Sequence, residues 1–330
     1  MTSRANPRGN VLRGRWRLDE FIGSGACAKV YGVTDLKASS NGDKESWVAK
    51  VCEVPQGLPP AIAKGKKRKK TEGEKNADML YYEYTLYNGF LRPHGGVAKV
   101  PPGGYGDDQG RRFMVMTRLG PDLSVAHAQT GPWSVSCIAG YSRQMLSLIR
   151  TLHERCRMVF VDVKPENFMM GLPGSPQESK IFLADFGLSE RFTGAGGVHK
   201  PQRQGNQPVG TPEFLSLSCH RGGNAGRCDD LESLGYVIIS FLRGGASPLP
   251  WSNARSNAEG LHTKESTSLE SLCSGLPPAM LQFMQAARDT PYEEEPDYDA
   301  LDCYLKTMVK SAGQGHAKGQ GKMGLVRGEG

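Results

Sequence analysis

The stretch "VFVDVKPENFMM", residues 159–170, sets three polar side chains in an otherwise apolar run. Asp162, Lys164 and Asn167 stand at fixed offsets there, and Asp185 interrupts a second apolar run, "KIFLADFGL", at residues 180–188. Burying a charged group is costly unless it is paired and hydrogen-bonded. These polar groups therefore need strong partners, and their convergence at such spacings disfavours a purely structural role for all of them.

The four side chains form a chemically coherent set. Asn167 and Asp185 offer the hard oxygen ligands that suit Mg²⁺, which binds a few protein oxygens together with phosphates and water. Asp162 remains able to accept a proton from a hydroxyl group, and Lys164 can neutralise charge on a transferred group. We therefore expect a metal-assisted group-transfer site.

A glycine-containing turn, "GSGACA" at residues 23–28, lies near the start of the chain. It matches GxGxxG except that Ala28 replaces the third glycine. Glycines let backbone amides approach a polyphosphate closely. A dinucleotide-binding fold would need a helix directly afterwards, whereas "KVYGV" at 29–33 has a strand pattern. The turn is either a phosphate-binding flap between two strands or an ordinary tight hairpin.

Lys50 lies in "WVAKV", residues 47–51, and alternates with apolar residues in a strand that should be mostly buried. A buried ammonium needs a partner. Glu83, in the middle of a predicted helix, is the natural candidate for it. The alternative is an edge-strand lysine that faces water.

The order of elements predicts an α+β fold with two lobes and a cleft between them. Strand patterns occupy the first third, and one precedes and one follows the glycine-rich stretch 101–110. Helical periodicity dominates the rest. The predicted strands are 16–22, 29–33, 46–53 and 111–117, and the predicted helices are 77–91, 137–152, 229–242, 280–288 and 298–308. On the first helix the residues expected to form the apolar face are Leu80, Tyr84, Tyr87 and Leu91. On the second helix they are Cys137, Tyr141, Met145, Leu148 and Leu152.

Composition predicts a disordered tail at residues 311–330, which are rich in Gly and Lys and have little apolar content. The strand-rich first third and the helix-rich remainder predict a small antiparallel sheet with one main helix, followed by a mostly helical lobe.

Composition narrows the class of protein. The 330 residues contain no long apolar run, and the start lacks the apolar stretch of a secretory signal, so we expect an intracellular protein, cytoplasmic or nuclear, without a membrane partner. The eight cysteines are scattered singly, which argues against a disulfide scaffold or a zinc module. Much of the net charge of +7 sits in "KGKKRKK", Lys64 to Lys70. This run is either a solvated loop or a nuclear-import or nucleic-acid patch.

Taken together, these motifs resemble a eukaryotic protein kinase. Segments "RCDDLESLGYVII" (227–239) and "EEEPDYDAL" (293–301) are similar to the casein kinase 1 superfamily, and "RRFMVMTRLGPDL" (111–123) and "GVHK" (197–200) to its vaccinia-related branch. The resemblance spans about Trp16 to Lys310. It implies one domain at residues 16–310, with an N-lobe (16–116) and a C-lobe (120–310), after a disordered extension at residues 1–15. The matching residues, in order, are Gly23, Gly25, Lys50, Glu83, Asp162, Asn167 and Asp185.

The resemblance implies ATP and Mg²⁺ as cofactors and protein Ser/Thr hydroxyls as acceptors, in a monomer. Lys50 would contact the nucleotide phosphates, oriented by Glu83, and Asp162 would be the base. Asp230 would begin the helix that anchors the catalytic loop, and Thr211 would position the substrate hydroxyl. The nucleotide would be held by Ile22, Gly23, Ser24, Gly25, Val30, Ala49, the gatekeeper Met116, the hinge from Thr117 to Leu119, and Met169. Arg203 would bind an anion and favour acidic or pre-phosphorylated substrates, or is simply an exposed loop arginine.

Three residues depart from the pattern. Phe160 and Val161 replace the His and Arg that usually precede the catalytic aspartate, and that arginine ordinarily binds a phosphate on the activation loop. We therefore expect activity without phosphorylation of residues 185–213. Ala28 is expected to weaken nucleotide binding. The alternatives are a pseudokinase that acts as a nucleotide-binding scaffold and a kinase for small molecules, which Lys164 disfavours.

Overall fold

The computed structural model describes residues 9–25, 27–38, 45–55, 62–63, 66–67, 69–244 and 248–317; side chains are described for all of these except 62–63, 66–67, 90 and 310–317. The chain divides into two compact units. The first unit is Met1–Pro121 with Met169–Gly187, and the second is Asp122–Phe168 with Leu188–Gly330. The expected α+β fold, with a strand-rich and a helix-rich part, is confirmed.

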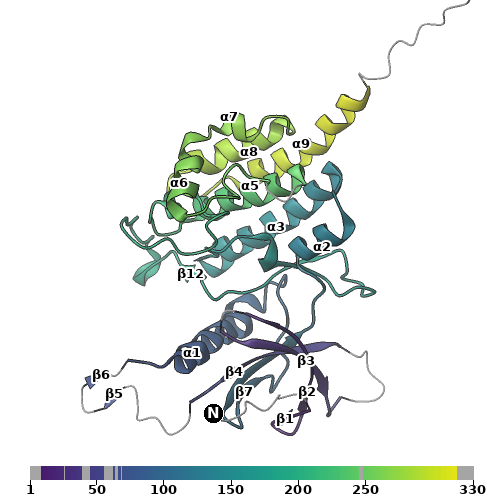
Figure 1. Cartoon of the computed structure of the whole chain (residues 1–330), viewed down its shortest axis with the longest axis vertical. Coiled ribbons are helices and arrows are strands. Elements are labelled where there is room, and N and C mark those ends of the chain that lie inside the picture. Colours follow the sequence, from purple (N-terminus) through teal and green to yellow (C-terminus); the bar gives the residue numbers. More distant parts are fainter. Residues whose placement is uncertain are drawn as a thin grey trace, which may run out of the picture. The chain divides into compact units, whose positions relative to one another are not determined.

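The first unit is built on an antiparallel sheet with the strand order β1-β2-β3-β4-β8-β7 (Figure 1). Its strands are β1 (Val11–Leu12), β2 (Trp16–Ser24), β3 (Lys29–Asp35), β4 (Trp47–Glu53), β7 (Tyr105–Asp108) and β8 (Arg111–Thr117). Alternating apolar residues of these strands, among them Trp16, Leu18 and Phe113, form one buried cluster. The predicted strands at 16–22, 29–33, 46–53 and 111–117 are therefore confirmed.

The predicted position of β7, one of the two strands that pair with β8, was wrong. We expected it before the glycine-rich stretch 101–110, but β7 lies inside that stretch. Glycine permits the positive φ values of 74° at Gly103 and 72° at Gly110, which bracket the strand. The glycines thus make the turns on either side of β7 rather than an irregular loop.

Helix α1 (Glu72–Thr85) packs on β4 and β8 and continues into a π-helical turn, Leu86–Leu91. It begins before the predicted residue 77 because Thr71 and Glu74 form a capping box, in which each side chain accepts a hydrogen bond from the other's backbone N–H. Leu80, Tyr87 and Leu91 are buried as expected, whereas Tyr84 is half-buried and stacks on Tyr105, with ring centroids 4.0 Å apart.

The basic run Lys64–Lys70 is described only in part. A short hairpin pairs β5 (Ile62–Ala63) with β6 (Lys66–Lys67), and Lys70 forms an ion pair with Asp78 of α1. Lys64, Gly65 and Arg68 lie outside the described residues. The choice between a solvated loop and an import signal therefore remains as the sequence left it.

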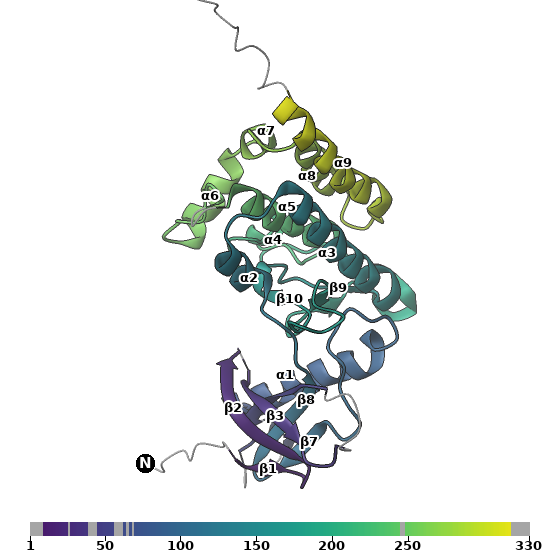
Figure 2. The same ribbon diagram turned by 90° about the vertical axis from the view of Figure 1, so that its right-hand side faces the viewer.

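The second unit is mostly helical. Helices α3 (Val135–Cys156), α5 (Arg227–Arg243), α8 (Pro278–Asp289) and α9 (Tyr298–Ala317) pack against one another (Figure 2). The remaining elements are α2 (Leu123–Thr130), β9 (Met158–Val159), β12 (Glu190–Arg191), α4 (Leu217–His220), α6 (Asn257–Ser266), α7 (Leu269–Leu272) and 3-10 turns at Pro165–Asn167 and Ala195–Gly197. The predicted helices at 137–152, 229–242, 280–288 and 298–308 all exist.

The buried face of α3 differs from the predicted stripe. Met145 and Leu152 are buried as expected, but Cys137, Tyr141 and Leu148 are only half-buried. The fully buried positions are Ile138, Ala139, Ser142, Met145, Leu146, Ile149, Leu152, His153 and Cys156. The face is rotated because α3 contacts both α5 and α9, so apolar spacing alone did not locate its centre.

The lobe boundaries also differ from the expectation. The chain enters the second unit at Asp122, but residues 169–187 return to the first unit. Strands β10 (Phe168–Met170) and β11 (Ile181–Leu183) form a hairpin there. Backbone N–H groups of Gly120 and Leu183 donate to Met170 and Gly96, respectively, and tie this hairpin to the first unit.

The C-terminal helix and the cysteines complete the comparison. Helix α9 runs to Ala317, beyond the predicted limit at Lys310, while residues 1–8 and 318–330 lie outside the described part. All eight cysteines are free thiols. Among the helices that the structure describes, none combines the length and apolar character needed to cross a membrane.

Candidate active site

The first unit brings Lys50 and Glu83 together. Lys50 lies in β4 opposite Val30 of β3 and Met114 of β8, and its Nζ is 2.5 Å from Oε1 of Glu83 in α1. The Glu83 side chain is only 2% exposed and that of Lys50 only 19%. The alternative of an edge lysine facing water is therefore wrong. Burial lowers the pKa of Lys50, but the nearby carboxylates of Glu83 and Asp185 outweigh it and raise the pKa, which keeps the amine charged.

Asp185 is held beside this pair by its backbone. It has φ 60°, and the backbone N–H of Gly187 donates to its Oδ1 at 3.2 Å. The next residue, Phe186, is fully buried against Tyr87 of the π-helical turn, with ring centroids 5.3 Å apart. Packing of Phe186 thus fixes the position of a carboxylate whose negative charge acts on Lys50.

The glycine turn joins two strands, as expected. Gly23 pairs with Val30 and Ser24 with Lys29, and the Gly25 N–H donates to the Ala28 carbonyl at 2.9 Å. Ala28 is buried, whereas Ile22 is 44% exposed. Ala26 lies outside the described residues.

The residues expected around adenine all belong to the first unit. Ala49 and Met116 are buried in β4 and β8, Val30 and Met169 are half-buried, and Thr117 is the last residue of β8. The N–H groups of Thr117 and Arg118 already donate to Lys99 and Ser46. The Leu119 N–H has no hydrogen-bond acceptor among the described residues, which leaves it available to a ligand.

The second unit gathers a group of side chains around Asp162. Oδ1 accepts from the Thr211 N–H at 2.9 Å and from the Thr211 hydroxyl at 2.8 Å. Oδ2 lies 2.7 Å from Lys164 Nζ, which also donates to the Thr211 hydroxyl at 3.1 Å. Asn167 Nδ2 donates to the Asp162 carbonyl at 2.8 Å. Four of the predicted site residues therefore meet.

The backbone around Asp162 is held by a residue far along the chain. Asp230, in α5, accepts the N–H groups of Phe160 at 2.6 Å and Val161 at 2.8 Å, and its Oδ2 is 2.9 Å from His153 Nε2. The other ring nitrogen of His153 is 2.7 Å from the Tyr298 hydroxyl. Val161 has φ 74°, a strained value for a β-branched residue. The two bonds to Asp230 hold that conformation in place.

Sequence reasoning identified Asp230 but missed three other residues of this group. His153 and Tyr298 orient Asp230. Gly210 has φ 114°, and a Cβ there would lie 2.9 Å from a methyl carbon of Leu215 and 3.3 Å from the carbonyl oxygen of Val161. A side chain at position 210 would therefore be strained and crowded. The signals available were a histidine on the apolar face of α3 and a glycine directly before Thr211.

Lys264 is a further buried group, which sequence reasoning did not single out. It is 1% exposed, and its Nζ donates to the carbonyls of Leu215 at 2.5 Å and Pro212 at 3.2 Å. It also lies over the rings of Tyr236 at 5.0 Å and Trp251 at 4.9 Å. These contacts hold the segment that follows Thr211.

The stability contributed by Lys264 should depend on pH. Burial lowers its pKa from 10.5 to about 7, with Glu232, Arg288, Glu213 and Cys219 as the other interacting groups. Between these values the unfolded chain binds a proton that the folded chain has released, so stability rises with pH. We expect wild-type protein to gain about 2 kcal/mol relative to Lys264→Met between pH 7 and pH 9. Denaturant unfolding at both pH values measures it, and a pH-independent difference would contradict it.

The metal-ligand candidates fall in different units, Asn167 in the second and Asp185 in the first. Both hydrogen bonds of the Asn167 side chain use its amide nitrogen, so its oxygen remains for a ligand, and Asp185 offers Oδ2. Hard oxygens suit Mg²⁺. No cluster of three His, Cys, Asp or Glu residues suited to a metal occurs in the described part of the chain. Each of the two residues thus offers an oxygen of the kind that Mg²⁺ binds, one in each unit.

Arg203 does not join these groups. Its backbone N–H donates to Asn224 Oδ1 at 2.5 Å, and its side chain is exposed. Nothing in its contacts decides between anion binding and a solvated loop arginine.

Comparisons with known proteins agree with this geometry. The family model described as protein kinase domain matches residues 16–294. Casein kinase I homolog 3 of Schizosaccharomyces pombe is 36% identical over 215 residues, 63% of this chain and 47% of that protein. Casein kinase I homolog 2 of the same yeast is 32% identical over 247 residues, which are 72% of this chain and 55% of that protein. Casein kinase I homolog 2 of Saccharomyces cerevisiae is 31% identical over 267 residues, which are 78% of this chain and 46% of that protein. The chain spans about half the length of these relatives.

Proposed function

Because the chain belongs to the protein kinase family, within its casein kinase 1 superfamily, we propose that it transfers the γ-phosphoryl group of MgATP to Ser/Thr hydroxyls of proteins. The observation that supports this most is the arrangement around Asp162. A carboxylate fixed by Thr211, Lys164 and Asn167 is a base with a defined direction. Within the superfamily we favour the vaccinia-related branch, on "RRFMVMTRLGPDL" and "GVHK".

Each side chain has a specific role in this proposal. Asp162 accepts the proton of the attacking hydroxyl, and Lys164 neutralises charge on the phosphoryl group as it moves. Lys50, kept charged by Glu83 and Asp185, binds the nucleotide phosphates. Asn167 and Asp185 would supply oxygen ligands to Mg²⁺, which would offset the phosphate charge. Positioning and charge neutralisation therefore account for most of the acceleration.

The decisive test is a radiolabelled ATP assay on casein, histone and an aminoglycoside, with Lys50→Met as the blank. Labelled casein or histone that depends on Lys50 supports the protein kinase. Labelling of the aminoglycoside alone would instead identify a small-molecule kinase. Adding pre-phosphorylated casein and an Arg203→Ala variant tests whether Arg203 selects acidic or phosphorylated substrates.

Activity should not depend on phosphorylation between residues 185 and 213. Val161 stands where most relatives place a phosphate-binding arginine, and it packs against the buried cluster of Val159, Phe192, Leu215, Cys219 and Ala225. Apolar packing therefore replaces a charge-assisted contact in this segment. We expect phosphatase-treated protein to keep most of its activity, measured against a mock-treated sample. Loss of nearly all activity would contradict this.

The nucleotide flap offers a smaller prediction. Ala28 is buried and its carbonyl closes the turn with Gly25, so its methyl group limits how the flap can move. We expect Ala28→Gly to lower the apparent KM for ATP about two- to threefold, by the modest scale of glycine effects on a backbone. Steady-state kinetics at saturating protein substrate measure it. Identical KM values would count against a role for this residue.

A pseudokinase scaffold is the second candidate, motivated by Ala28, Phe160 and Val161. The joint presence of Lys50, Glu83, Asp162, Asn167 and Asp185 favours the active enzyme over it. A thermal shift with MgATP and no phosphate transfer to any protein, including itself, would favour the scaffold. We also propose that the protein is an intracellular monomer. Fusing residues 64–70 to a fluorescent reporter tests whether this run directs nuclear import.

A further inference from the structure

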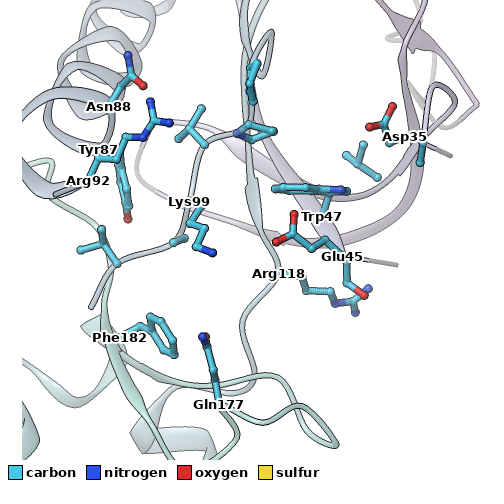
Figure 3. Close-up of a pocket in the computed structure, with 18 of the residues that line it drawn as sticks. Asp35, Glu45, Trp47, Tyr87, Asn88, Arg92, Lys99, Arg118, Gln177 and Phe182 are labelled. Carbon is cyan, nitrogen blue, oxygen red and sulfur yellow. The ribbon is translucent and has the colours of Figure 1, made fainter. Parts of the chain in front are cut away.

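The first unit contains a pocket of about 1360 Å³ that the proposed phosphoryl transfer does not use. It is bounded by the middle of β2, the end of β3, the start of β4, the π-helical turn after α1, the segment 95–102, Arg118 and residues 177–182 (Figure 3). Lys50, Glu83 and Asp185 do not line it. The volume exceeds the ~300–1,000 Å³ of a usual small-molecule site and suits a short peptide.

The apolar residues that line the pocket are held by the fold. Phe182 of β11 and Val97 are each 9% exposed, and Leu183, next to Phe182, is tied to Gly96 by a backbone hydrogen bond. Trp47, which Figure 3 shows across the open space from Phe182, packs edge-on against the buried Trp16, with ring centroids 6.0 Å apart. Rigid apolar side chains can accept a partner's side chain with little loss of entropy in the protein.

One side of the pocket carries positive charge. Arg92, Lys99 and Lys180 line it with exposed side chains, and within the described ranges none of the three has an acidic partner. In Figure 3 the amine of Lys99 points into the open space, with Phe182 and Gln177 across from it.

The backbones of the two lysines are well anchored. Lys99 accepts from the Thr117 N–H at 2.9 Å, and its own N–H donates to the Thr117 hydroxyl at 3.2 Å. The Lys180 N–H donates to Gln177 at 2.9 Å, and its carbonyl accepts from Gly171 at 2.9 Å. The backbone positions from which the two side chains project are therefore fixed, whereas the charged ends of the side chains are free to adapt.

The other side of the pocket is neutral or acidic. Arg15 is paired with Asp35 at 2.7 Å and Arg118 with Glu20 at 2.7 Å, while Glu45 also lines this side. A long polyanion such as a nucleic acid would lie against these carboxylates as well as the cations. A short acidic segment can contact the cationic side alone, which is how charge complementarity selects a partner.

We propose that this pocket docks an acidic linear segment of a partner protein, with carboxylates at Arg92, Lys99 and Lys180 and one bulky apolar side chain on Phe182. The mode combines an anionic motif read by cations with an apolar anchor in a preformed hollow. The docking does not depend on phosphoryl transfer.

The test uses the full chain and a fluorescent peptide of glutamates around a single phenylalanine, without Ser, Thr or Tyr, so that it cannot be a substrate. Fluorescence anisotropy measures its Kd. We expect saturable binding that weakens as salt rises. The Lys99→Glu and Lys180→Glu double variant should raise Kd at least tenfold, because two attractive charges become repulsive.

Three controls make the result specific. Lys75→Glu, the same charge reversal at an exposed lysine of α1 that does not line the pocket, should bind like wild type. Lys50→Met should also bind normally, which separates docking from catalysis. Unchanged melting temperature and activity on casein would show that the double variant is folded.

Several outcomes would overturn the proposal. These are no binding by wild type, equal binding by the folded double variant, or tighter binding of a lysine-based peptide. Equal binding of a peptide with glycine in place of phenylalanine would refute the apolar anchor. Displacement by a short oligonucleotide at lower concentration than by unlabelled peptide would identify a nucleic-acid surface instead.

Discussion

Asp162→Asn is expected to lower kcat by about 10²–10⁴-fold, the range that a positioned general base contributes. The amide keeps the size of the side chain and an oxygen for Thr211, but it cannot take the proton of the attacking hydroxyl. Asp162 contacts Thr211, Lys164 and Asn167, so the loss should fall on kcat rather than on the KM for ATP. Steady-state kinetics with purified variant protein measure both constants.

Glu166→Gln is the matched control. It makes the same change from carboxylate to amide in the same loop, but Glu166 is exposed. We expect this variant to keep nearly full kcat. If Asp162→Asn, with a normal melting temperature, turned over as fast as wild type, the assignment of the base would be wrong.

Asp230→Ala should have the largest effect on folding stability. Asp230 is 1% exposed and accepts two backbone N–H groups and a bond from His153. Its loss leaves these buried donors without an acceptor, at about 1–3 kcal/mol for each unsatisfied group. We expect the free energy of unfolding to fall by about 3–5 kcal/mol, the usual cost of breaking a buried polar network. Denaturant titration of wild type and variant measures it.

The activity of Asp230→Ala should also fall. Val161, the residue directly before the base Asp162, loses the hydrogen bond that holds its strained φ of 74°. Asp299→Ala is the control. Asp299 forms an ion pair with Arg150, but its side chain is 84% exposed, so its loss should change stability by less than about 1 kcal/mol. Equal losses in the two variants would show that Asp230 is not the anchor.

Much of the fold followed from local patterns. Alternating residues predicted β2, β3, β4 and β8, and helical spacing predicted the main helices, because these patterns record which face of an element is buried. The prediction for β7 was wrong because glycines make the turns at both ends of this short strand, so the whole stretch resembles a loop in the sequence. The face of α3 was rotated because two neighbouring helices, not one, cover it.

The sequence by itself determined which residue types can carry the chemistry. Asp162, Lys164 and Asn167 lie within a few residues of one another, so their relative placement is nearly a local property of the chain. The sequence also identified Glu83 as a candidate partner for Lys50, but it left open an edge-strand lysine that faces water.

Tertiary structure alone decided the partners that come from far along the chain. Residue chemistry does not say that Asp230 accepts the N–H groups of Phe160 and Val161, or that Lys264 bonds to Leu215, because such contacts depend on how helices pack. The cationic pocket has the same origin. Lys99 and Lys180 are distant in sequence and share one hollow only because the β10–β11 hairpin joins the first unit.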